Sequence, residues 1–563
     1  MLEALYELGV SYIFCNLGSD HPAIIEALAK AKVSSKPVPK AIITPHESVA
    51  LNAAHGCYLA SGKAQGVFVH TDVGTQNMGG SLHNIARSRV PLFIFSGETP
   101  YTMYGELRGS RNSEINYLQN VYDQRGIVRN YVKWEGDVRT GKNVKQLVYR
   151  CMQIANSEPK GPVYLAAARE VLEENLLPDE SGPESWKPLT LPPVSQEDIE
   201  KILRDLAAAE NPLLITSSAG RNAESVDELV KLCETLAIPV IEMNPQYMNF
   251  PANHPLHLGF DPGERLSEAD VVLVVDSDVP WIPNIHNTRP QQKIYYIDAD
   301  PIKEDIPLWH IPAEAFYKAD SLKTLKLMNA AASRIPPDRN AIASRAARLA
   351  QEHERQRRQW KEAEKPSSSG YLTPEYVTAC IREAIDDDTI VLNEALTSSF
   401  IVSKHLPRSK PGTIFFNGGS SLGWSGGGAF GVKLAQPDRT VINLIGDGCY
   451  MLSNPSAVYW MARRYKAPIM TIVYNNQGWN ATKLNYLRLY PDGVGHQNDL
   501  YWVNFDQPAD MAKIAEGAGG AFAASAATPD ELTEALNAGL KAVRSGQSAV
   551  IDVKLEPISA QKD

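Results

Sequence analysis

Two apolar runs that flank a helix-length segment, within residues 439–479, constrain the fold more than any other part of the chain. The first run, 440–445, is rich in β-branched residues and stops at Gly-Asp-Gly, which predicts a buried strand that ends in a tight loop. The second run, 468–474, has the same apolar character. Between them, Asn454 can cap a helix and Pro455 suits its first turn. A strand, a helix and a strand in this length form a βαβ unit whose two strands are parallel.

Polar residues follow both predicted strands. Parallel strands end at the same edge of a sheet, so Asp447 and Asn476 should project from neighbouring carboxyl ends, where open α/β sheets hold their ligands. A carboxylate, an amide oxygen and the backbone carbonyl near Gly478 are hard oxygen ligands, which suit Mg²⁺ that takes its remaining ligands from phosphate and water. Gly446 and Gly448 let backbone N–H groups approach phosphate oxygens. The pattern predicts a magnesium site that holds a diphosphate.

The order Gly446-Asp447-Gly448, 26 residues and then Asn475-Asn476 resembles the thiamin diphosphate motif of the 2-oxo acid decarboxylase and acetolactate synthase family. The resemblance implies thiamin diphosphate and Mg²⁺ as cofactors. From this motif it implies the cofactor contacts Gly446, Asp447, Gly448, Cys449 and Asn476, and the metal ligands Asp447, Asn476 and Gly478. The alternative is a tight turn with a capping aspartate and an asparagine pair that closes a strand.

The composition is that of an ordinary soluble globular protein, with 44% hydrophobic and 21% charged residues among 563. A net charge of −10 argues against binding to nucleic acid or to an anionic membrane surface. Six cysteines without paired spacing indicate a reducing compartment, and no apolar run reaches the length of a membrane span, so we expect a cytoplasmic protein. Related chains usually begin earlier, so we expect the native start to lie upstream of Met1.

Short apolar strands alternate with helices along the whole chain, which predicts an α/β fold of three doubly wound parallel-sheet domains. A proline-rich, loop-like stretch follows the first domain, and the run PSSSG at 366–370 precedes the last. The predicted domains are residues 1–178, 190–335 and 371–563. By the resemblance, which covers nearly the whole chain, they are a pyrimidine-binding, a middle and a diphosphate-binding domain.

Glu47 stands out in the first domain. It follows a predicted strand and begins an alanine-rich helix, which is a suitable position for a carboxylate in a dry pocket. The resemblance implies that Glu47 bonds the aminopyrimidine ring of thiamin diphosphate and so promotes deprotonation of the thiazolium carbon. The alternative is an acidic residue that favours the dipole of its helix.

Ser19 and His70 are the next candidates. The strings NLGSDHP and FVHTDVGTQN most resemble benzoylformate decarboxylases within the family, which implies that these two side chains act on the substrate carboxylate and in proton transfer. As alternatives, Ser19 could cap a helix and His70 could be a strand-end histidine with its own partners. His21 and His46 compete for the proton-transfer role. Glu98 stands where the family more often has glutamine.

In the last domain, Thr397 and Ser398 begin a predicted helix, where hydroxyl and N–H groups suit either phosphate or plain capping. A glycine-rich segment follows. By the resemblance, Leu422 is the apolar residue under the cofactor that bends it into a V shape, and the alternative is an ordinary core leucine. In the middle domain, the turn at 217–221 is interpreted as structural rather than nucleotide-binding, and the segment with Trp281 and His286 is a candidate for the substrate pocket.

The resemblance implies an enzyme that decarboxylates a 2-oxo acid and then protonates the resulting enamine or joins it to a second carbonyl compound. An acetolactate synthase-like carboligase and a catalytically inactive scaffold subunit are the alternatives. Retention of Glu47, Leu422, Asp447 and Asn476 together argues against the scaffold. We expect a small-molecule 2-oxo acid and an aldehyde acceptor as partners, no nucleic acid or membrane, and a homodimer or homotetramer, because the family builds each site from two chains.

Overall fold

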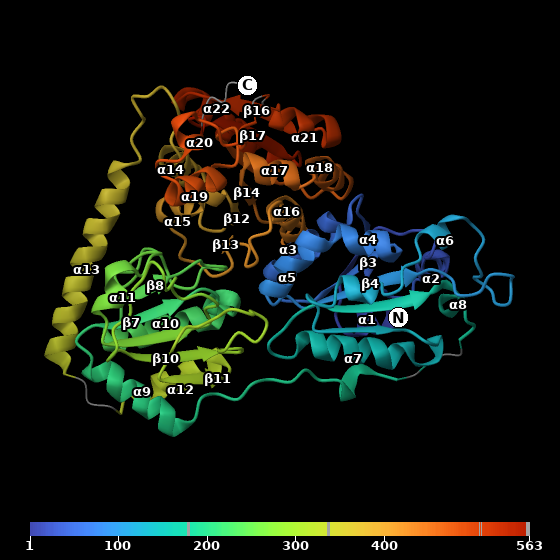
Figure 1. Ribbon diagram of the computed structural model, residues 1–563, viewed down its shortest axis with the longest axis horizontal. Coiled ribbons are helices and arrows are strands. Elements are labelled where there is room, and N and C mark those ends of the chain that lie inside the picture. Colours follow the sequence, from blue (N-terminus) through green and yellow to red (C-terminus); the bar gives the residue numbers. More distant parts are fainter. Residues whose placement is uncertain (177–178, 180, 335–337, 506, 508, 559–563) are drawn as a thin grey trace.

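The computed structural model describes residues 1–176, 179, 181–334, 338–505, 507 and 509–558. These residues form three α/β units, each around a sheet of parallel strands (Figure 1). The predicted fold class of three parallel-sheet α/β domains is therefore confirmed. The predicted boundaries at 178, 335 and 563 lie outside the described residues.

Each sheet has a strand order in which chain neighbours are not all spatial neighbours. In spatial order, the first sheet contains β2 (Lys40–Ile43), β1 (Tyr12–Cys15), β3 (Gln65–Val69), β4 (Leu92–Glu98), β6 (Val163–Ala168) and β5 (Trp134–Asp137). The middle sheet contains β11 (Ala315–Lys318), β10 (Lys293–Asp298), β9 (Val271–Val275), β7 (Pro212–Thr216) and β8 (Val240–Glu242). The last sheet contains β13 (Ile414–Phe415), β12 (Ile390–Glu394), β14 (Val441–Gly446), β15 (Met470–Asn475), β17 (Ala549–Lys554) and β16 (Phe522–Ala526).

Helices cover the faces of these sheets, as parallel strands require. The first domain contains α1 (Leu2–Glu7), α2 (Pro22–Val33), α3 (Glu47–Ser61), α4 (Thr71–Asn77), α5 (Gly79–Arg87), α6 (Ile115–Leu118), α7 (Val144–Asn156) and α8 (Arg169–Leu172). The middle domain contains α9 (Gln196–Ala208), α10 (Ala223–Leu236), α11 (Gly263–Glu268) and α12 (Ser321–Ala332), and α13 (Arg339–Glu362) leads from it to the last domain. The last domain contains α14 (Pro374–Ala384), α15 (Ser399–His405), α16 (Trp424–Ala435), α17 (Asp447–Leu452), α18 (Pro455–Arg464), α19 (Asn480–Leu489), α20 (Val494–Gln497), α21 (Met511–Gly519) and α22 (Pro529–Arg544).

Helices α3 and α16 join the first domain to the last, and their backbones come unusually close. A Cβ atom on Gly431 would lie 1.9 Å from the carbonyl oxygen of Ala53, and one on Gly56 would lie 1.9 Å from that of Gly428. Only glycine permits this approach. The two helices thus share one apolar core.

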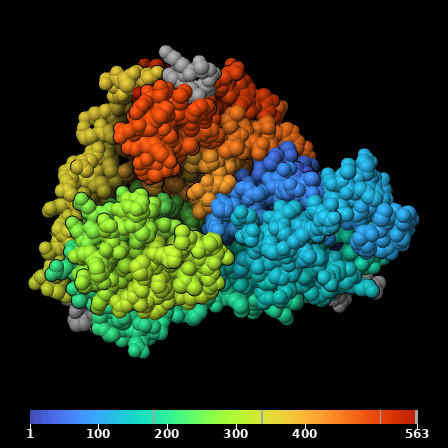
Figure 2. Space-filling model, in the orientation of Figure 1, coloured from blue at the N-terminus to red at the C-terminus, as the bar shows by residue number. Residues whose placement is uncertain are grey.

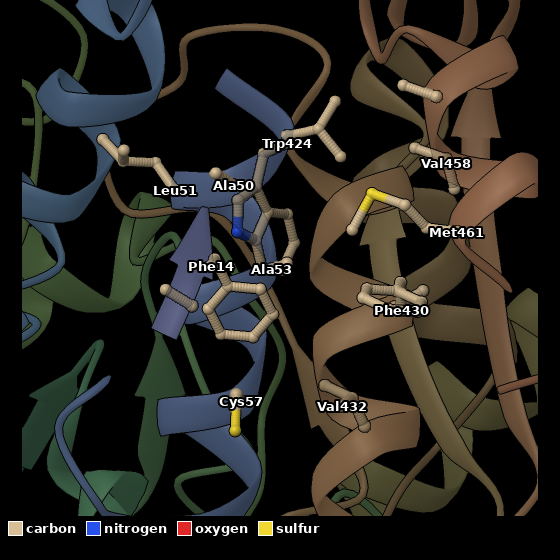
Figure 3. Packing of buried hydrophobic residues seen from close by; sticks show 14 of the residues in the cluster. Phe14, Ala50, Leu51, Ala53, Cys57, Trp424, Phe430, Val432, Val458 and Met461 are labelled. Carbon is tan, nitrogen blue, oxygen red and sulfur yellow. The ribbon is translucent and has the colours of Figure 1, made fainter. Parts of the chain in front are cut away.

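That shared core is closed by an aromatic side chain. The fully buried indole of Trp424, from α16, lies among residues of the first domain, with Phe14, Ala50 and Ala53 nearby (Figure 3). Phe430 and other side chains of α16 and α18 continue the same core into the last domain. The first and last domains therefore pack as one unit.

The middle domain makes polar contacts with both other domains. Arg89 of the first domain bonds Asp278 at 2.8 Å and Asp298 at 2.7 Å, both in the middle domain. On the other side, the N–H of Phe416 donates to the carbonyl of Gln246 at 3.0 Å. The domains form distinct lobes on the surface (Figure 2). Among the helices of the described residues, none is both long and apolar enough to cross a bilayer.

The close contact of α3 and α16 predicts the effect of a small substitution. Gly431→Ala should destabilise the protein by about 1–3 kcal/mol, because the added methyl overlaps the backbone of α3. Gly517→Ala is the matched control, since Gly517 also lies in a helix but has open space around it, and we expect a gain of up to about 1 kcal/mol. Thermal unfolding of both variants measures the difference. Equal stability of the two variants would contradict the close packing.

Candidate active site

Asp447 and Asn476 come together because their strands are neighbours. Strands β14 and β15 pair in parallel, with Gly446 opposite Tyr474, so both polar residues follow at one sheet edge. The two oxygens of Asp447 accept bonds from the N–H of Gly448 at 2.7 Å and from the N–H of Gly478 at 3.0 Å. The structure therefore links the ends of the two strands through the Asp447 carboxylate.

Asp447 is a buried acid without a cationic partner. It is 3% exposed, and among the described residues no lysine, arginine or histidine forms an ion pair with it. Burial raises the pKa of the Asp447 carboxyl to about 6, although backbone N–H groups oppose this shift. A divalent cation would offset the cost of keeping the carboxylate ionised.

The other two proposed ligands also have oxygens to offer. The side-chain oxygen of Asn476 is buried and has no hydrogen-bond partner in the described part of the chain, which is unusual for a buried polar atom. The carbonyl of Gly478 is not entirely free, because the N–H of Asn480 donates to it at 3.1 Å. A carbonyl has a second lone pair. The donor set of Asp447, Asn476 and Gly478 therefore fits Mg²⁺.

Two details around this motif differ from the sequence interpretation. The chain does not pass through a tight loop after β14, because α17 begins directly at Asp447. Asn454 is the residue before α18 but its side chain does not cap that helix. Its amide instead donates to the Ser48 hydroxyl of the first domain at 3.4 Å, and its backbone is left-handed with φ of 54°. Tertiary contact has replaced local capping.

A cavity of about 580 Å³ opens between the last and middle domains at the same sheet edge. Such a volume suits a cofactor-sized guest. Thr397 and Leu422 line the cavity, while Ser398, which is buried, does not. The remaining proposed cofactor residues, in the motif at 446–449 and Asn476, also lie outside its lining.

Glu394, at the end of β12, is a buried carboxylate that the sequence interpretation did not single out. It is buried and accepts bonds from the N–H groups of Gly423, Trp424 and Ser425 at 2.8–3.1 Å. It thereby satisfies the free donors at the start of α16. Burial raises the pKa of Glu394, which these donors oppose. The residue fixes the segment that carries Leu422.

Glu47 is the first residue of α3 and is 7% exposed. Its Oε2 accepts a bond from the amide of Asn77 at 3.1 Å, and its Oε1 lies over Gly74, where a Cβ would be 3.2 Å away. The helix cap itself comes from His46, whose Nδ1 accepts from the N–H of Ser48. Glu47 does not line the cavity that contains Leu422. The cavity that contains Leu422 in the single chain therefore lacks the other proposed cofactor contact, Glu47.

Ser19 and His70 lie at the carboxyl edge of the first sheet. Ser19 is exposed, and within the described part of the chain its hydroxyl has no hydrogen bond and caps no helix. His70 is half-buried directly after β3 and bonds Asp20 through Nδ1 and Gln119 through Nε2. Burial raises the pKa of the nearby Glu98 carboxyl to about 7, and the charge of Asp137 adds to this. This edge therefore carries an imidazole and a carboxyl group, of which the carboxyl can exchange protons near neutral pH.

The middle-domain candidates lie elsewhere. Trp281 is 1% exposed inside the core of its own domain, and His286 pairs with Asp261 at 3.0 Å. Neither lines the cavity, although Asp278 and Val279 of the same segment do. The expectation that Trp281 reaches the pocket is wrong, because its ring is used for packing, and the same expectation for His286 stays a prediction.

The turn after β7 is consistent with a structural role. The N–H groups of Ser217 and Ser218 both donate to the carbonyl of Asp276, at 3.2 and 2.9 Å. These donors are therefore consumed within the domain rather than presented to a phosphate.

Sequence models of one family match the chain in three parts. They are described as the N-terminal TPP binding domain, the central domain and the C-terminal TPP binding domain of thiamine pyrophosphate enzymes, and they match residues 1–127, 199–314 and 397–553. The chain belongs to the thiamine pyrophosphate enzyme family. Two of the three parts are named for binding the cofactor, which supports thiamin diphosphate as the cofactor of this family member.

Curated relatives of this thiamine pyrophosphate enzyme span nearly its whole length. A benzoylformate decarboxylase of Pseudomonas aeruginosa is 26% identical, covering 99% of this chain and 98% of that protein. The acetolactate synthase large subunit of Haemophilus influenzae is 23% identical, covering 95% and 90%. A solved structure of a 4-hydroxybenzoylformate decarboxylase of Rhodococcus jostii superposes with a TM-score of 0.79 at 23% identity, covering 99% and 98%. That structure supports the fold.

The burial of Asp447 predicts how pH and a bound metal change the stability of the fold. In metal-free protein the carboxyl has a pKa near 6, against 3.8 in an unfolded chain, so the folded state binds the proton more tightly. Stability should therefore fall as pH rises from about 4 to about 6, and Asp447→Asn should remove this fall. Thermal unfolding against pH, with a chelator present, measures it.

The same variant should lose the rise in unfolding temperature that Mg²⁺ with pyrophosphate gives to the wild type, because the charged ligand is gone. Asp438→Asn, at the opposite end of β14 and exposed, is the control and should behave as the wild type. Equal protection of Asp447→Asn and wild type by the metal would exclude this site.

Proposed function

We propose that this protein is a magnesium- and thiamin diphosphate-dependent enzyme that removes CO₂ from a 2-oxo acid and then protonates the product carbon or joins it to an aldehyde. The observation that carries the proposal is the pair formed by the Asp447 carboxylate and the Asn476 oxygen at adjacent strand ends, which have no cation and no hydrogen-bond partner, respectively, among the residues that the structure describes. When bound, thiamin diphosphate would supply the electron sink for the electron pair released as CO₂ leaves.

The residues of the last domain would hold the cofactor. Asp447, Asn476 and the Gly478 carbonyl would hold Mg²⁺, and Gly446 and Gly448 give the diphosphate access to backbone N–H groups. Trp479 lies against Gly448, where a Cβ would be 2.2 Å from its ring, so this approach depends on glycine. Leu422 would support the cofactor from the wall of the cavity.

Glu47 would supply the acid–base group for the cofactor. Its Oε2 is oriented by Asn77, and the absence of a side chain at Gly74 leaves room around Oε1. The low exposure of Glu47 excludes water from the carboxylate, which strengthens its hydrogen bonds to a bound ring. Ser19 and His70 would act on the substrate at the same edge of the first sheet.

A carboligating reaction is the second candidate. The acetolactate synthase relative supports it, and the benzoylformate decarboxylase relative supports protonation instead. Incubation with a panel of 2-oxo acids, with and without aldehydes, and analysis of CO₂ and products separates the two. No CO₂ release from any 2-oxo acid would contradict the proposed function.

Glu47→Gln tests the acid–base role. The substitution is nearly isosteric, so cofactor affinity should fall only modestly while decarboxylation falls by a factor of about 10² or more. Hydrogen–deuterium exchange at the reactive carbon of bound thiamin diphosphate should slow in parallel. Ser19→Ala and His70→Ala are the contrasting variants, because they should slow turnover and leave this exchange fast. If the exchange in Glu47→Gln proceeds at the wild-type rate, then Glu47 has no acid–base role and is only an acidic residue at the start of its helix.

We further propose a homodimer, or a tetramer built from such dimers, in which Glu47 of one chain serves the Asp447 site of the other. Its support is that Glu47 lies outside the cavity of its own chain. Co-expression of Glu47→Gln with Asp447→Ala tests this. A mixed dimer would contain one intact site, so activity should return to about a quarter of the wild-type value, although each variant alone is inactive. No recovery in a sample shown to contain mixed dimers would place both residues in the site of one chain.

A further inference from the structure

A buried carboxylate lies directly behind His70. Asp20, in the loop between β1 and α2, is 4% exposed, and its Oδ1 lies 2.5 Å from Nδ1 of His70. Its Oδ2 accepts a bond from the N–H of Thr71 at 3.4 Å. Gly97 of β4 makes room for this carboxylate, since a Cβ there would lie 1.8 Å from Oδ2. The Asp20 carboxylate is therefore held in a fixed position at the carboxyl edge of the first sheet.

The second ring nitrogen of His70 also faces an acceptor. Its Nε2 lies 2.9 Å from the amide oxygen of Gln119, which follows α6. A carboxylate and an amide oxygen can only accept, so the ring satisfies both contacts only with a proton on each nitrogen. The geometry thus favours the imidazolium form of His70.

The charged groups around His70 agree with this. Burial alone lowers the pKa of His70, yet the bond and charge of Asp20 raise it above its ordinary value, and Asp72 on α4 adds to the rise. Burial alone raises the pKa of Asp20, and its two histidine partners lower it to about 2. The other partner is His21, whose Nδ1 lies 2.8 Å from the same Oδ1. Behind the loop, Arg169 donates to the carbonyl of Ser19 at 3.4 Å.

We propose that Asp20 is a positioning residue that keeps His70 doubly protonated and fixes its ring, and that Gln119 holds the Nε2 proton until the substrate takes its place. This inference rests on the proposed function. When CO₂ has left, the Nε2–H bond of His70 breaks as a C–H bond forms at the carbon that carried the carboxylate. His70 is left neutral, with Nδ1–H still donated to Asp20, and regains its proton from water.

Gln119 is placed to give way. It belongs to the stretch from 99 to 124, which carries exposed apolar side chains such as Tyr104, Leu118 and Tyr122. Asp20, by contrast, is held by two histidines and a backbone N–H. His70 therefore has one fixed contact, to Asp20, and one contact that substrate can replace, to Gln119.

Asp20→Asn tests the contact between Asp20 and His70 in protein without substrate or cofactor. NMR titration of ¹³C-labelled histidine gives the midpoint of His70, which is the pH at which its ring is half protonated. The His70 signal is identified by its loss in His70→Gln. We expect the protonation constant of His70 to fall about tenfold or more in Asp20→Asn, because a charged acceptor becomes a neutral one. His21→Gln is the matched control, since it removes the other histidine on Oδ1 and should leave His70 strongly protonated.

A second variant protects the test against misfolding. Gln119→Leu removes the replaceable acceptor from a half-exposed position and should lower the His70 midpoint by a smaller amount while the protein stays folded. In turnover, Asp20→Asn should lower kcat more than it changes KM and should shift the basic limb of the pH–rate profile downward, whereas Asp20→Glu should restore part of both.

The outcomes separate the two proposals. An unchanged His70 midpoint in folded Asp20→Asn overturns the positioning role, whatever the enzyme's activity. If the titration midpoint of His70 falls but the pH–rate profile is unchanged, then His70 is not the proton donor, which also overturns the proposed proton transfer. If the midpoint of His70 falls but the wild type converts no 2-oxo acid, then the proposed function fails. The proton transfer from His70 to the product carbon then fails with it, while the positioning role of Asp20 stands.

Discussion

The contact between α3 and α16 is the constraint on which the rest of the structure depends. Glycines at 56 and 431 let the two backbones approach to a distance that no other residue permits, and Trp424 fills the space beside them. This contact fixes how the first sheet sits against the last. It also sets where the start of α3, with Glu47, and the segment with Leu422 lie in the assembled molecule.

Three buried carboxylates at sheet edges are stabilised in three different ways. Glu394 accepts backbone N–H bonds at the start of a helix, which is a permanent structural solution. Asp20 lies beside the Nδ1 atoms of two histidines, His21 and His70. Among the described residues, Asp447 has only backbone donors and no cationic partner. These environments agree with the roles that we propose, which are scaffold for Glu394, support of a proton-transfer group for Asp20 and ligand binding for Asp447.

Much of the fold and part of the site follow from local patterns. The alternation of short apolar strands and helices predicted three parallel sheets, and the spacing of Asp447 and Asn476 correctly predicted neighbouring strand ends. Both inferences depend only on the rule that parallel strands end at one edge. The match to thiamine pyrophosphate enzymes agrees with them. The assignments of Glu47, Ser19 and His70 remain predictions.

What the sequence did not reveal depends on contacts between distant segments. Asp20 and His70 are 50 residues apart, and nothing local marks the aspartate as a partner of that histidine. Asn454 has a capping residue type but bonds Ser48 of another domain. Trp281 was expected in the pocket and lies in a core, because an aromatic residue in a loop looks the same in both settings. In each case contacts between distant segments, which the local sequence does not show, decided the outcome.

The pairing of α3 with α16 also has a consequence for biosynthesis. Asn52 donates to the carbonyl of Gly423, a residue 371 positions later in the chain. At a translation rate of about 5–20 residues per second, the partner of α3 emerges roughly 20–75 s after α3 itself. During that interval the alanine-rich face of α3 is complete but uncovered. The nascent first domain must therefore stay soluble with its future interface exposed, which makes the order of synthesis, and not only the final packing, a determinant of the yield of folded protein.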